Sequence, residues 1–500
     1  LNSYRECSGS IVISRGLGTR DLVKSLQNNE IIGMVVDQGG KDGVLVPFFD
    51  REASMSVGAI RMGLKRGIPI CFSIIFREKG EKHRMVIHPP FELVNTGDAE
   101  KDVMSNLTKV TEIMENYIHR YPSEYMWFYK IWKYSNHVDV VMLNDQRTGH
   151  LRQSETVFRH AQDVLEGQNK KIQKHVVDVD FKNAIAQKIF SIFGLTPFLF
   201  FYRGKIQLLK LFLTKESYEG LASKRCDFVI SCGSSLAGVN YFLAKDHHAR
   251  SIVVQKPGMW PLEKFDLVIL PQHDAQKTSR LGKKHVAVTS GAPNLVNEKY
   301  LQDESKKLLQ RFSHLKNRSR FKIGVLIGGN SKKVFLSEQQ IKILIQQIKQ
   351  VSQDLKADLL ITTSRRTPPK IEQMFLREFK KNPSCPLLIL ASRENVKEAV
   401  GGILGLSDIV VVSGDSISMV SEAASSGKYT VVFLPQKKDV LLKGSNKHID
   451  FIENLNDQGF VLSSHVNDIS HSIYSIAKNK IQTKPINDDQ VIREAMKYVI

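Results

Sequence analysis

From residue 138 onward the chain repeats one pattern: a short apolar run, a polar loop rich in Gly or Ser, and a segment with helical spacing. Apolar runs of this length that alternate with helical segments are typical of parallel β-strands connected by helices. A polar, basic helical segment at about 298–316 divides the pattern into two series. The sequence therefore predicts two doubly wound α/β lobes in succession, at 136–315 and 316–500.

The loops that follow the predicted strands carry most of the candidate site residues. Ligands of open α/β sheets bind outside the carboxyl ends of the strands, where such loops gather. Two lobes with ligand-type loops resemble the glycosyltransferase-B (GT-B) arrangement. The candidate ligand-binding residues are Gly149, His150, Gln153, Gly328, Gly329, Asn330, Ser364, Arg365, Arg366, Asp415, Ser416, Ser418 and Glu422.

These residue types favour a phosphorylated ligand. We expect backbone amides after Gly328-Gly329, and at the helix that follows Asp415, to hold a diphosphate. Arg365 and Arg366 offer two charge-assisted phosphate contacts that need no metal. One helical turn beyond Ser418, Glu422 is expected to accept hydrogen bonds from ribose hydroxyls.

His150 opens the helix after the first strand, where it could act as a base or bind a phosphate. For every candidate in these loops, ordinary capping and turn structure is the alternative interpretation.

Residues 1–134 predict part of a separate α/β lobe. Asp21–Asn29 has helical spacing, 31–36 is an apolar run typical of a buried strand, and 39–43 is a Gly-rich loop. A run at 44–49, a helix at about 56–66 and a strand at 69–76 are expected to follow.

The charge of the chain indicates an anionic partner. Lys and Arg number 71 against 51 Asp and Glu, which gives a formal net charge of +20. No helix-turn-helix, zinc-finger or RNA-binding aromatic signature is present, so no nucleic-acid partner is expected. The alternatives are an anionic membrane surface, a phosphorylated small molecule, or a basic surface that only keeps the protein soluble. The five cysteines have no metal-ligand or redox spacing, which favours a reducing compartment and no metal.

An apolar stretch at 189–202 is too short to span a membrane and is interrupted by Gly194 and Pro197. Basic residues follow it, as in segments that lie in a membrane interface. A buried core element is an equally good interpretation.

The first 134 residues resemble the late lipid A acyltransferases of the lysophospholipid-acyltransferase superfamily. The resemblance rests on Val-Asp-Gln at 36–38, the Gly-rich loop, Val-Pro-Phe-Phe at 46–49 and the closing segment Tyr121–Trp127 with Trp132-Lys133. It implies acyl transfer from acyl carrier protein to a glycolipid hydroxyl. The family's catalytic His-x4-Asp/Glu pair is expected ahead of Leu1 and is absent from this chain. Arg5 and Asp37 match supporting positions of the family; a salt bridge and a strand-end cap are the structural alternative.

The remainder resembles the family named for a plant mitochondrial-fission protein. Six motifs occur in order: Gly149-His150-x-x-Gln153, Pro271-x-His273-Asp274, Gly291-Ala292-Pro293-Asn294, Gly328-Gly329-Asn330, Ser364-Arg365-Arg366-Thr367 and Asp415-Ser416-x-Ser418-Met419-x-Ser421-Glu422-Ala423. Bacterial members of that family are labelled as predicted nucleotide-sugar enzymes, so the resemblance implies a GT-B fold and leaves the chemistry open.

Together the two resemblances predict an envelope-lipid enzyme at the cytoplasmic face of the bacterial inner membrane. Its expected partners are acyl carrier protein, anionic membrane lipids and a lipid A-type glycolipid, with a nucleotide sugar as a possible ligand of 136–500 and no other cofactor. Two alternatives remain open. The chain could be a catalytically inactive docking protein, or glycosyltransferase activity could reside in 136–500.

Overall fold

The computed structural model describes residues 6–7, 9–13, 18–192, 206–275, 284–330, 334–394, 396–437, 447–479 and 483–500. The chain divides into two compact units, Leu1–His137 and Val138–Ile500. Arg5 and most of the apolar stretch 189–202 lie outside the described residues. In the part of the chain that the structure describes, no helix combines the length and apolar character needed to cross a membrane.

The first unit contains three helices and two separate antiparallel ribbons among its described residues. The helices are α2 (Thr19–Gln27), α3 (Gly58–Arg66) and α4 (Ala99–Arg120), and the ribbons pair β1 (Val44–Phe48) with β2 (Arg51–Met55) and β3 (Ser73–Lys79) with β4 (Lys82–Ile87). Apolar residues of β1 and β2 pack against the buried face of α4 in one core, which includes Phe48, Leu107 and Met114.

The buried strand predicted at 31–36 is wrong. The segment has no regular secondary structure, and Ile31 and Val35 are 100% and 76% exposed. A buried strand needs neighbours to satisfy its backbone and cover its side chains. No described strand pairs with this segment, so its apolar composition does not by itself produce a strand.

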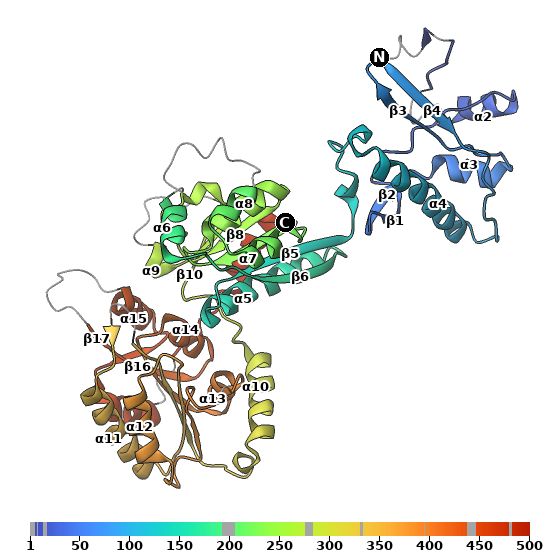
Figure 1. Ribbon diagram of the computed structural model, residues 1–500. Helices are drawn as coiled ribbons and strands as arrows, with labels where there is room; N and C mark the ends of the chain where they lie inside the picture. The colour runs from blue at the N-terminus through green and yellow to red at the C-terminus, as the bar shows by residue number, and fades with distance from the viewer. Residues whose placement is uncertain are drawn as a thin grey trace. The chain divides into compact units, whose positions relative to one another are not determined.

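The first lobe of the second unit is a six-stranded sheet in the order β10-β9-β8-β7-β5-β6, and the pairs β10–β9, β9–β8, β8–β7 and β7–β5 are parallel. Helices cover both faces (Figure 1). The elements are β5 (His137–Asn144), α5 (Thr148–Glu166), β6 (Lys171–Asp178), α6 (Ala184–Ile192), α7 (Lys215–Ala222), β7 (Phe228–Cys232), α8 (Ala237–His247), β8 (Arg250–Val254), β9 (Leu267–Pro271), α9 (Gln272–Ala275) and β10 (Val286–Thr289).

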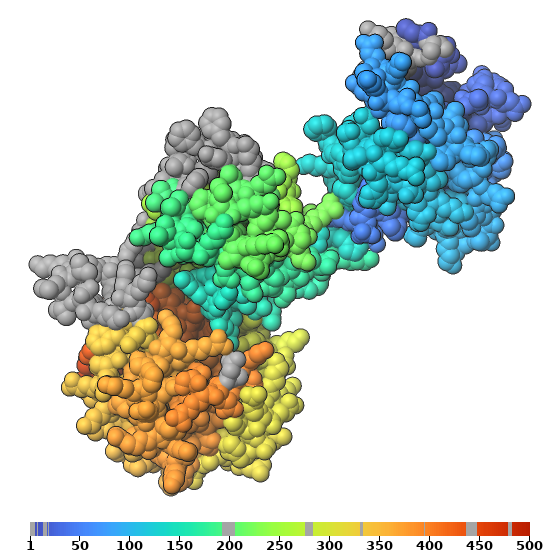
Figure 2. Space-filling model, in the orientation of Figure 1, coloured from blue at the N-terminus to red at the C-terminus, as the bar shows by residue number. Residues whose placement is uncertain are grey.

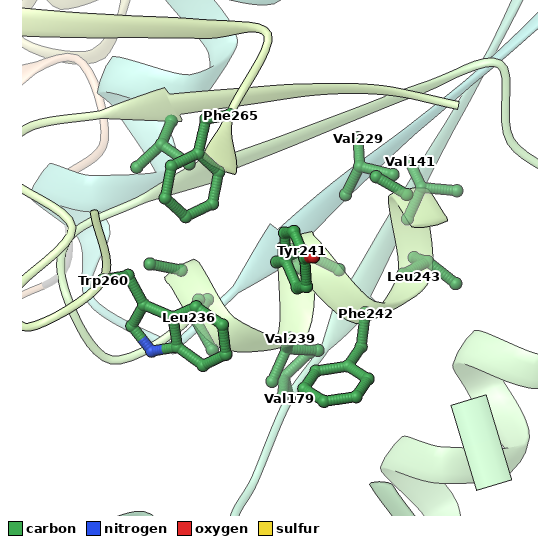
Figure 3. Packing of buried hydrophobic residues seen from close by; sticks show 14 of the residues in the cluster. Val141, Val179, Val229, Leu236, Val239, Tyr241, Phe242, Leu243, Trp260 and Phe265 are labelled. Carbon is green, nitrogen blue, oxygen red and sulfur yellow. The ribbon is translucent and has the colours of Figure 1, made fainter. Parts of the chain in front are cut away.

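An apolar core holds the strands of this lobe in place. Tyr241 and Phe242 of α8 pack against Trp260, with ring centroids 5.5 and 6.2 Å from its ring, in one buried cluster with Val141 and Val229 of the sheet (Figure 3). Asn240 of the same helix donates to the main-chain oxygens of Val229 and Ile252 at 3.2 and 2.9 Å. Strands β7 and β8 are therefore fixed by both packing and hydrogen bonds.

The second lobe is a second parallel six-stranded sheet, in the order β14-β13-β11-β15-β16-β18. Its elements are β11 (Lys322–Ile327), α11 (Glu338–Asp354), β13 (Asp358–Thr363), α12 (Pro369–Phe379), β14 (Leu387–Ile389), α13 (Ala399–Leu406), β15 (Ile409–Ser413), α14 (Ile417–Ser425), β16 (Tyr429–Phe433), α15 (Lys447–Asp457), β18 (Leu462–Ser464) and α16 (Ile469–Asn479), with a two-stranded ribbon β12 (Val334–Phe335) and β17 (Gln436–Lys437). Figure 2 shows this lobe mainly in yellow to orange beside the green first lobe.

Two helices pack in a different lobe from the one to which the boundary predicted between residues 315 and 316 assigns them. Helix α10 (Glu298–Arg311) packs on α13 of the second lobe, where Gly402 and Gly405 leave room for Leu308 and Ser305. The last helix, α17 (Asp489–Val499), returns to pack on α5 and β10 of the first lobe. Apolar side chains of α17, including Ile492 and Met496, complete that lobe's core.

The two stretches of chain that connect the lobes lie side by side. The Asp488 carboxylate accepts the backbone N–H groups of Ser290 and Gly291 at 3.0 and 3.1 Å. The outgoing connection near 290 and the returning connection near 488 are thus joined directly.

Each sheet has one point where the strand order reverses direction. In the first lobe this point lies between β5 and β7, and in the second lobe between β11 and β15. Loops that leave the carboxyl ends of such strand pairs diverge to opposite faces and open a crevice for ligands.

Candidate functional site

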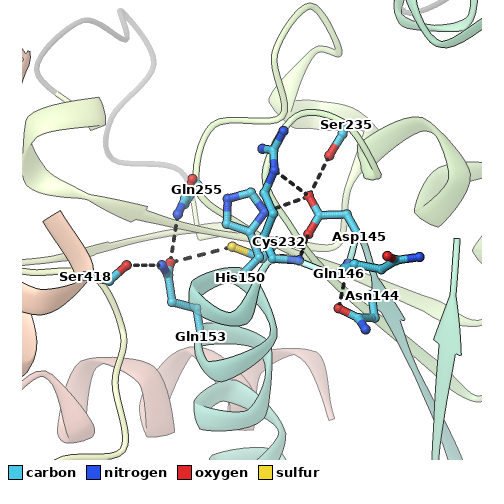
Figure 4. A network of polar contacts seen from close by, with 10 residues as sticks. Asn144, Asp145, Gln146, His150, Gln153, Cys232, Ser235, Gln255 and Ser418 are labelled. Carbon is cyan, nitrogen blue, oxygen red and sulfur yellow. Dashed lines mark hydrogen bonds and ion pairs between the residues drawn. The ribbon is translucent and has the colours of Figure 1, made fainter. Parts of the chain in front are cut away.

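A hydrogen-bonded Asp–His pair lies at the strand-order reversal of the first lobe. Asp145 follows β5, and its Oδ2 lies 2.8 Å from Nδ1 of His150 in the first turn of α5. The same carboxylate oxygen accepts the hydroxyl of Ser235, from the loop after β7, at 3.1 Å. Figure 4 shows these side chains converging on one carboxylate. The chain turns sharply here, because Gln146 between them has a φ of 62°.

The pair orients the imidazole. Burial opposes ionisation of Asp145, but hydrogen bonds from His150 and Ser235 and the charges of His150 and Arg147 hold the pKa of its carboxyl below the ordinary value. An ionised carboxylate accepts a proton-bearing Nδ1, and in the neutral tautomer that carries this proton Nε2 is an acceptor. Gly233, at φ 83°, lies against the ring: a Cβ there would be 2.8 Å from Cε1 of His150.

Gln153 connects the two lobes at the same place. It is buried, one turn after His150, and its Nε2 donates to the hydroxyl of Ser418 in α14 at 3.2 Å. Its Oε1 accepts from Gln255 at 3.0 Å (Figure 4). A Cβ on Gly149 would lie 3.3 Å from the same Ser418 hydroxyl. The first turns of α5 and α14 therefore face each other across the lobe boundary.

The strand-order reversal of the second lobe holds a buried carboxylate. Asp415 follows β15 and is fully buried, and its Oδ2 accepts the backbone N–H of Gly329 at 2.7 Å. Its Oδ1 has no hydrogen-bond partner among the described residues. Burial raises the pKa of this carboxyl to about 6, against the opposing effects of Ser413, Gly329 and Arg366.

The amides of the Gly328-Gly329 pair do not face a ligand. Gly328 donates to the hydroxyl of Ser413 at 2.6 Å, and Gly329 donates to Asp415. The glycines allow close approach instead, since a Cβ on Gly328 would lie 2.3 Å from Asp415 Oδ2 and one on Gly329 would lie 2.0 Å from the main-chain oxygen of Arg366. The diphosphate contact is expected at the amides after this pair; of these, 331–333 lie outside the described residues, and the contact stays a prediction. Asn330, which follows, is exposed and accepts the Leu336 N–H at 3.2 Å.

The loop after β13 presents two exposed arginines beside that carboxylate. Arg365 and Arg366 are exposed, and the positive charge of Arg366 acts on Asp415. Thr367 closes the turn, since its hydroxyl donates to the Gly328 carbonyl and accepts the Ser364 N–H at 2.9 Å. The turn holds both arginines at the carboxyl edge of the sheet.

Glu422 has a partner that the sequence did not reveal. Its Oε1 lies 3.2 Å from Nη1 of Arg152 in the first lobe, and their side chains are 12% and 30% exposed. Burial raises the pKa of Glu422, and the charge of Arg152 opposes that effect. A ribose hydroxyl, which is the expected partner of Glu422, would have to share its carboxylate with Arg152. Ser416 lies at the N-cap position of α14, where no side chain caps the helix.

In the first unit, Asp37 lies against the closing segment. Its main-chain oxygen accepts the hydroxyl of Tyr125 at 3.4 Å, and its Oδ1 is buried with no hydrogen-bond partner among the described residues. Burial and, next, the charge of Asp37 raise the pKa of Tyr125 to about 12. Tyr129 donates to the Gly39 carbonyl, so the Gly-rich loop is held by the same segment. Arg5, the expected partner of Asp37, is outside the described residues.

The class of protein follows from the second unit: an α/β protein with two Rossmann-like lobes of GT-B type, whose strand-order reversals face one boundary. Residues 148–497 match the family model described as mitochondrial fission ELM1. Because this match spans more than half of the chain, the chain belongs to that family. Residues 1–134 match the model described as bacterial lipid A biosynthesis acyltransferase. Both family resemblances predicted from the sequence are thus confirmed.

Curated relatives include an uncharacterised protein of Rickettsia prowazekii, 25% identical over 55% of this chain and 80% of its own length. The mitochondrial fission protein ELM1 of Arabidopsis thaliana is 26% identical over 40% of this chain, and the match spans about half of the plant protein, 49%. Among solved structures, the UDP-GlcNAc 2-epimerase of Methanocaldococcus jannaschii is similar with a TM-score of 0.44 and 10% identity, over 72% of this chain and 98% of that one.

Sequence reasoning missed Asp145, Ser235 and Arg152. Asp145 could have been found, because it lies two residues after a predicted strand, as Asp415 does. Ser235 requires knowledge that β7 neighbours β5, and Arg152 requires the arrangement of the two lobes. No local pattern distinguishes either of these residues.

Proposed function

We propose that this chain is a transferase of envelope glycolipid biosynthesis, in which the second unit binds a nucleotide sugar or a phosphorylated glycolipid between its lobes. The observation that carries the proposal is the facing pair of strand-order reversals, with Asp145–His150 on one side and Asp415, Arg366 and α14 on the other. The match of 1–134 to the acyltransferase model supports the glycolipid as the common substrate class.

Each side supplies different chemistry. Arg365 and Arg366 provide fixed positive charge for phosphate oxygens at the edge of the second sheet. Beside them Asp415 is a buried carboxylate whose Oδ1 has no hydrogen-bond partner among the described residues. We infer that acyl transfer belongs to the first unit as part of an intact acyltransferase, with acyl carrier protein as donor, at the cytoplasmic face of the inner membrane.

Glycosyl transfer by the second unit is a second candidate, favoured by the Asp145–His150 pair. In this step Nε2 of His150 takes the proton of an acceptor hydroxyl. The hydroxyl oxygen bonds to the anomeric carbon of the donor sugar as the bond to the nucleoside diphosphate breaks. Asp145 is then a positioning residue, which holds the Nδ1 proton and stabilises the imidazolium.

Calorimetric titration of the full chain with UDP-sugars and with a phosphorylated glucosamine disaccharide tests the proposal. We expect saturable binding to one class and at least a tenfold loss of affinity in Arg365→Ala/Arg366→Ala, because two charge-assisted contacts are removed. Arg320→Ala is the matched control, since Arg320 is exposed but precedes β11, at the opposite edge of the sheet.

Unchanged affinity in the double variant would contradict the assignment of the arginines. Binding of neither class would contradict the proposal and favour a docking protein. For the second candidate, Asp145→Asn should lower kcat of glycosyl transfer or of slow donor hydrolysis without raising KM, and should move the pH profile.

A further inference from the structure

The β3–β4 ribbon of the first unit has one face that the described core does not cover. Antiparallel pairing sets Ile75 opposite Met85, and Ile87 lies two residues beyond Met85 on the same face. These three side chains are 63%, 59% and 64% exposed. Strand residues of one parity share a face, so the exposed apolar side chains form one continuous cross-strand patch (Figure 1 shows the ribbon).

The opposite face of the ribbon belongs to the core. Phe72 and Phe76 are buried there, and Phe76 stacks on Tyr121 at 4.0 Å between ring centroids. The ribbon is further fixed by Glu124, whose Oε2 accepts the Arg77 N–H at 3.1 Å. The apolar patch is therefore presented by a folded, anchored element.

Basic residues follow the apolar side chains toward the turn. Arg77 pairs with His83 on the face of Ile75 and Met85, the register then shifts, and Lys79 pairs with Lys82 at the end of the ribbon. All four are exposed. Glu78 lies on the other parity, where it pairs with Arg84. We call the exposed surface formed by Ile75, Met85, Ile87, Arg77 and His83, together with Lys79 and Lys82 at the end of the ribbon, the β3–β4 face.

This combination fits a lipid surface better than a protein. A specific protein interface needs about 800 Å² from each partner and a well-packed apolar centre, and three apolar side chains bordered by cations fall short of that. An interfacial membrane contact needs only a few apolar side chains below the headgroups and cations at their level. Lys and Arg near an anionic membrane are attracted by its surface potential.

We propose that the β3–β4 face docks the protein on an anionic phospholipid membrane, with Ile75, Met85 and Ile87 entering the interface and Arg77, Lys79 and Lys82 contacting headgroup phosphates. This inference rests on the proposed function in one respect, because the glycolipid substrate is placed in the same membrane. Beyond the proposed function, it identifies the surface of the protein that contacts the membrane.

Flotation of the full chain with vesicles tests the inference. We expect binding to phosphatidylglycerol–phosphatidylcholine vesicles, weaker binding to pure phosphatidylcholine, and a decrease at high salt. Arg77→Gln/Lys82→Gln should weaken binding to the anionic vesicles by about 30-fold, roughly fivefold for each cation. Ile75→Ser/Met85→Ser/Ile87→Ser should lose binding at all salt concentrations, because the replaced side chains no longer enter the interface.

Matched controls come from the second unit. Lys380→Gln/Lys381→Gln removes two exposed cations and Ile185→Ser removes an exposed apolar side chain, and neither should change flotation. Circular dichroism of each variant establishes that it is folded.

Vesicle binding that is equal in the wild type and the triple Ser variant would overturn the inference. So would a wild-type dimer that the triple Ser variant converts to a monomer, because the face would then contact a second copy. Nucleotide-sugar titration of the same variants separates the two proposals. If the variants of the β3–β4 face lose flotation but still bind the ligand, the membrane contact of that face is supported independently of the ligand site. If the wild type binds the ligand but does not float with vesicles, the docking inference is wrong and the proposed function stands.

Discussion

Asp145 and Asp415 occupy similar positions, each within two residues of the end of a strand at a strand-order reversal, yet their environments shift their pKa values in opposite directions. Hydrogen bonds and positive charge outweigh burial at Asp145 and lower its pKa. At Asp415 burial dominates and raises the pKa to about 6. Asp145 therefore orients the imidazole of His150 as a carboxylate, whereas Asp415 is partly protonated near neutral pH.

Replacement of Asp415 by Asn should change how stability depends on pH. A carboxyl whose folded pKa is about 6, against an ordinary 3.8, stabilises the fold fully below pH 3.8 and loses that contribution as the pH rises to about 6. Asn keeps an acceptor for the Gly329 N–H and does not titrate. We therefore expect Asp415→Asn and wild type to differ little at pH 4, and the variant to be more stable by roughly 2–3 kcal/mol at pH 7.

Urea unfolding of both proteins at pH 4, 5.5 and 7 measures this difference. Asp303→Asn on exposed α10 is the control, with a change within about 0.5 kcal/mol. A constant difference between Asp415→Asn and wild type across the pH range would show that burial does not raise the pKa of Asp415.

The sequence indicates which loops lie at the strand ends of the candidate site, but it does not indicate which partners their polar atoms have. Asp415, Arg365 and Arg366 could be chosen because strand ends are visible as apolar runs. The internal hydrogen bonds of Gly328 and Gly329 depend on β15 lying beside β11, which is a long-range pairing. Single-residue chemistry was therefore predictable, and partner identity was not.

Helices α5 and α14 join the lobes through a hydrogen bond and an ion pair. Arg152 and Glu422 form the ion pair, and Gln153 and Ser418 form a hydrogen bond. Both pairs are partly or fully withdrawn from solvent, where a lost partner leaves an uncompensated polar group.

A double-mutant cycle with Arg152→Met and Glu422→Gln should give a coupling energy of about 1–3 kcal/mol, because the pair is partly buried. The exposed pair Arg61–Glu100, at 3.4 Å, is the control and should give less than about 0.5 kcal/mol. Urea unfolding of the four proteins of each cycle provides the values. Equal coupling in the two cycles would mean that Arg152 and Glu422 are separated in solution.

At the element level, the two sheets were predicted well and the first unit less so. Strands such as β9 and β15 are visible in the sequence because buried parallel strands are continuous apolar runs bounded by polar residues, Gly or Pro. The segment 31–36 has the same composition without a neighbouring strand, and the lobes of α10 and α17 are set by packing on α13 and α5. Those outcomes depend on contacts between residues far apart in the sequence, so no short stretch of sequence predicts them.

The whole molecule has two units with separate cores, one built on β1, β2 and α4 and the others within the two-lobed unit. Units with their own cores unfold independently unless a large interface couples them. We expect calorimetry to show at least two transitions. Met114→Ala should lower only the transition of the first unit and Phe375→Ala only one of the second, each by about 2–5 kcal/mol in stability. A shift of every transition by either variant would show that the units unfold together.

Because α17 returns to pack on the first lobe, the second lobe is an insertion that is attached by two connecting segments rather than one. Those segments are joined where the Asp488 carboxylate accepts the backbone N–H groups of Ser290 and Gly291. Two adjacent attachments restrict relative motion far more than a single linker, since both must bend about the same line. We therefore expect any opening of the crevice to be a hinge rotation about the segments at 290 and 488, and this rotation has to break the Arg152–Glu422 ion pair.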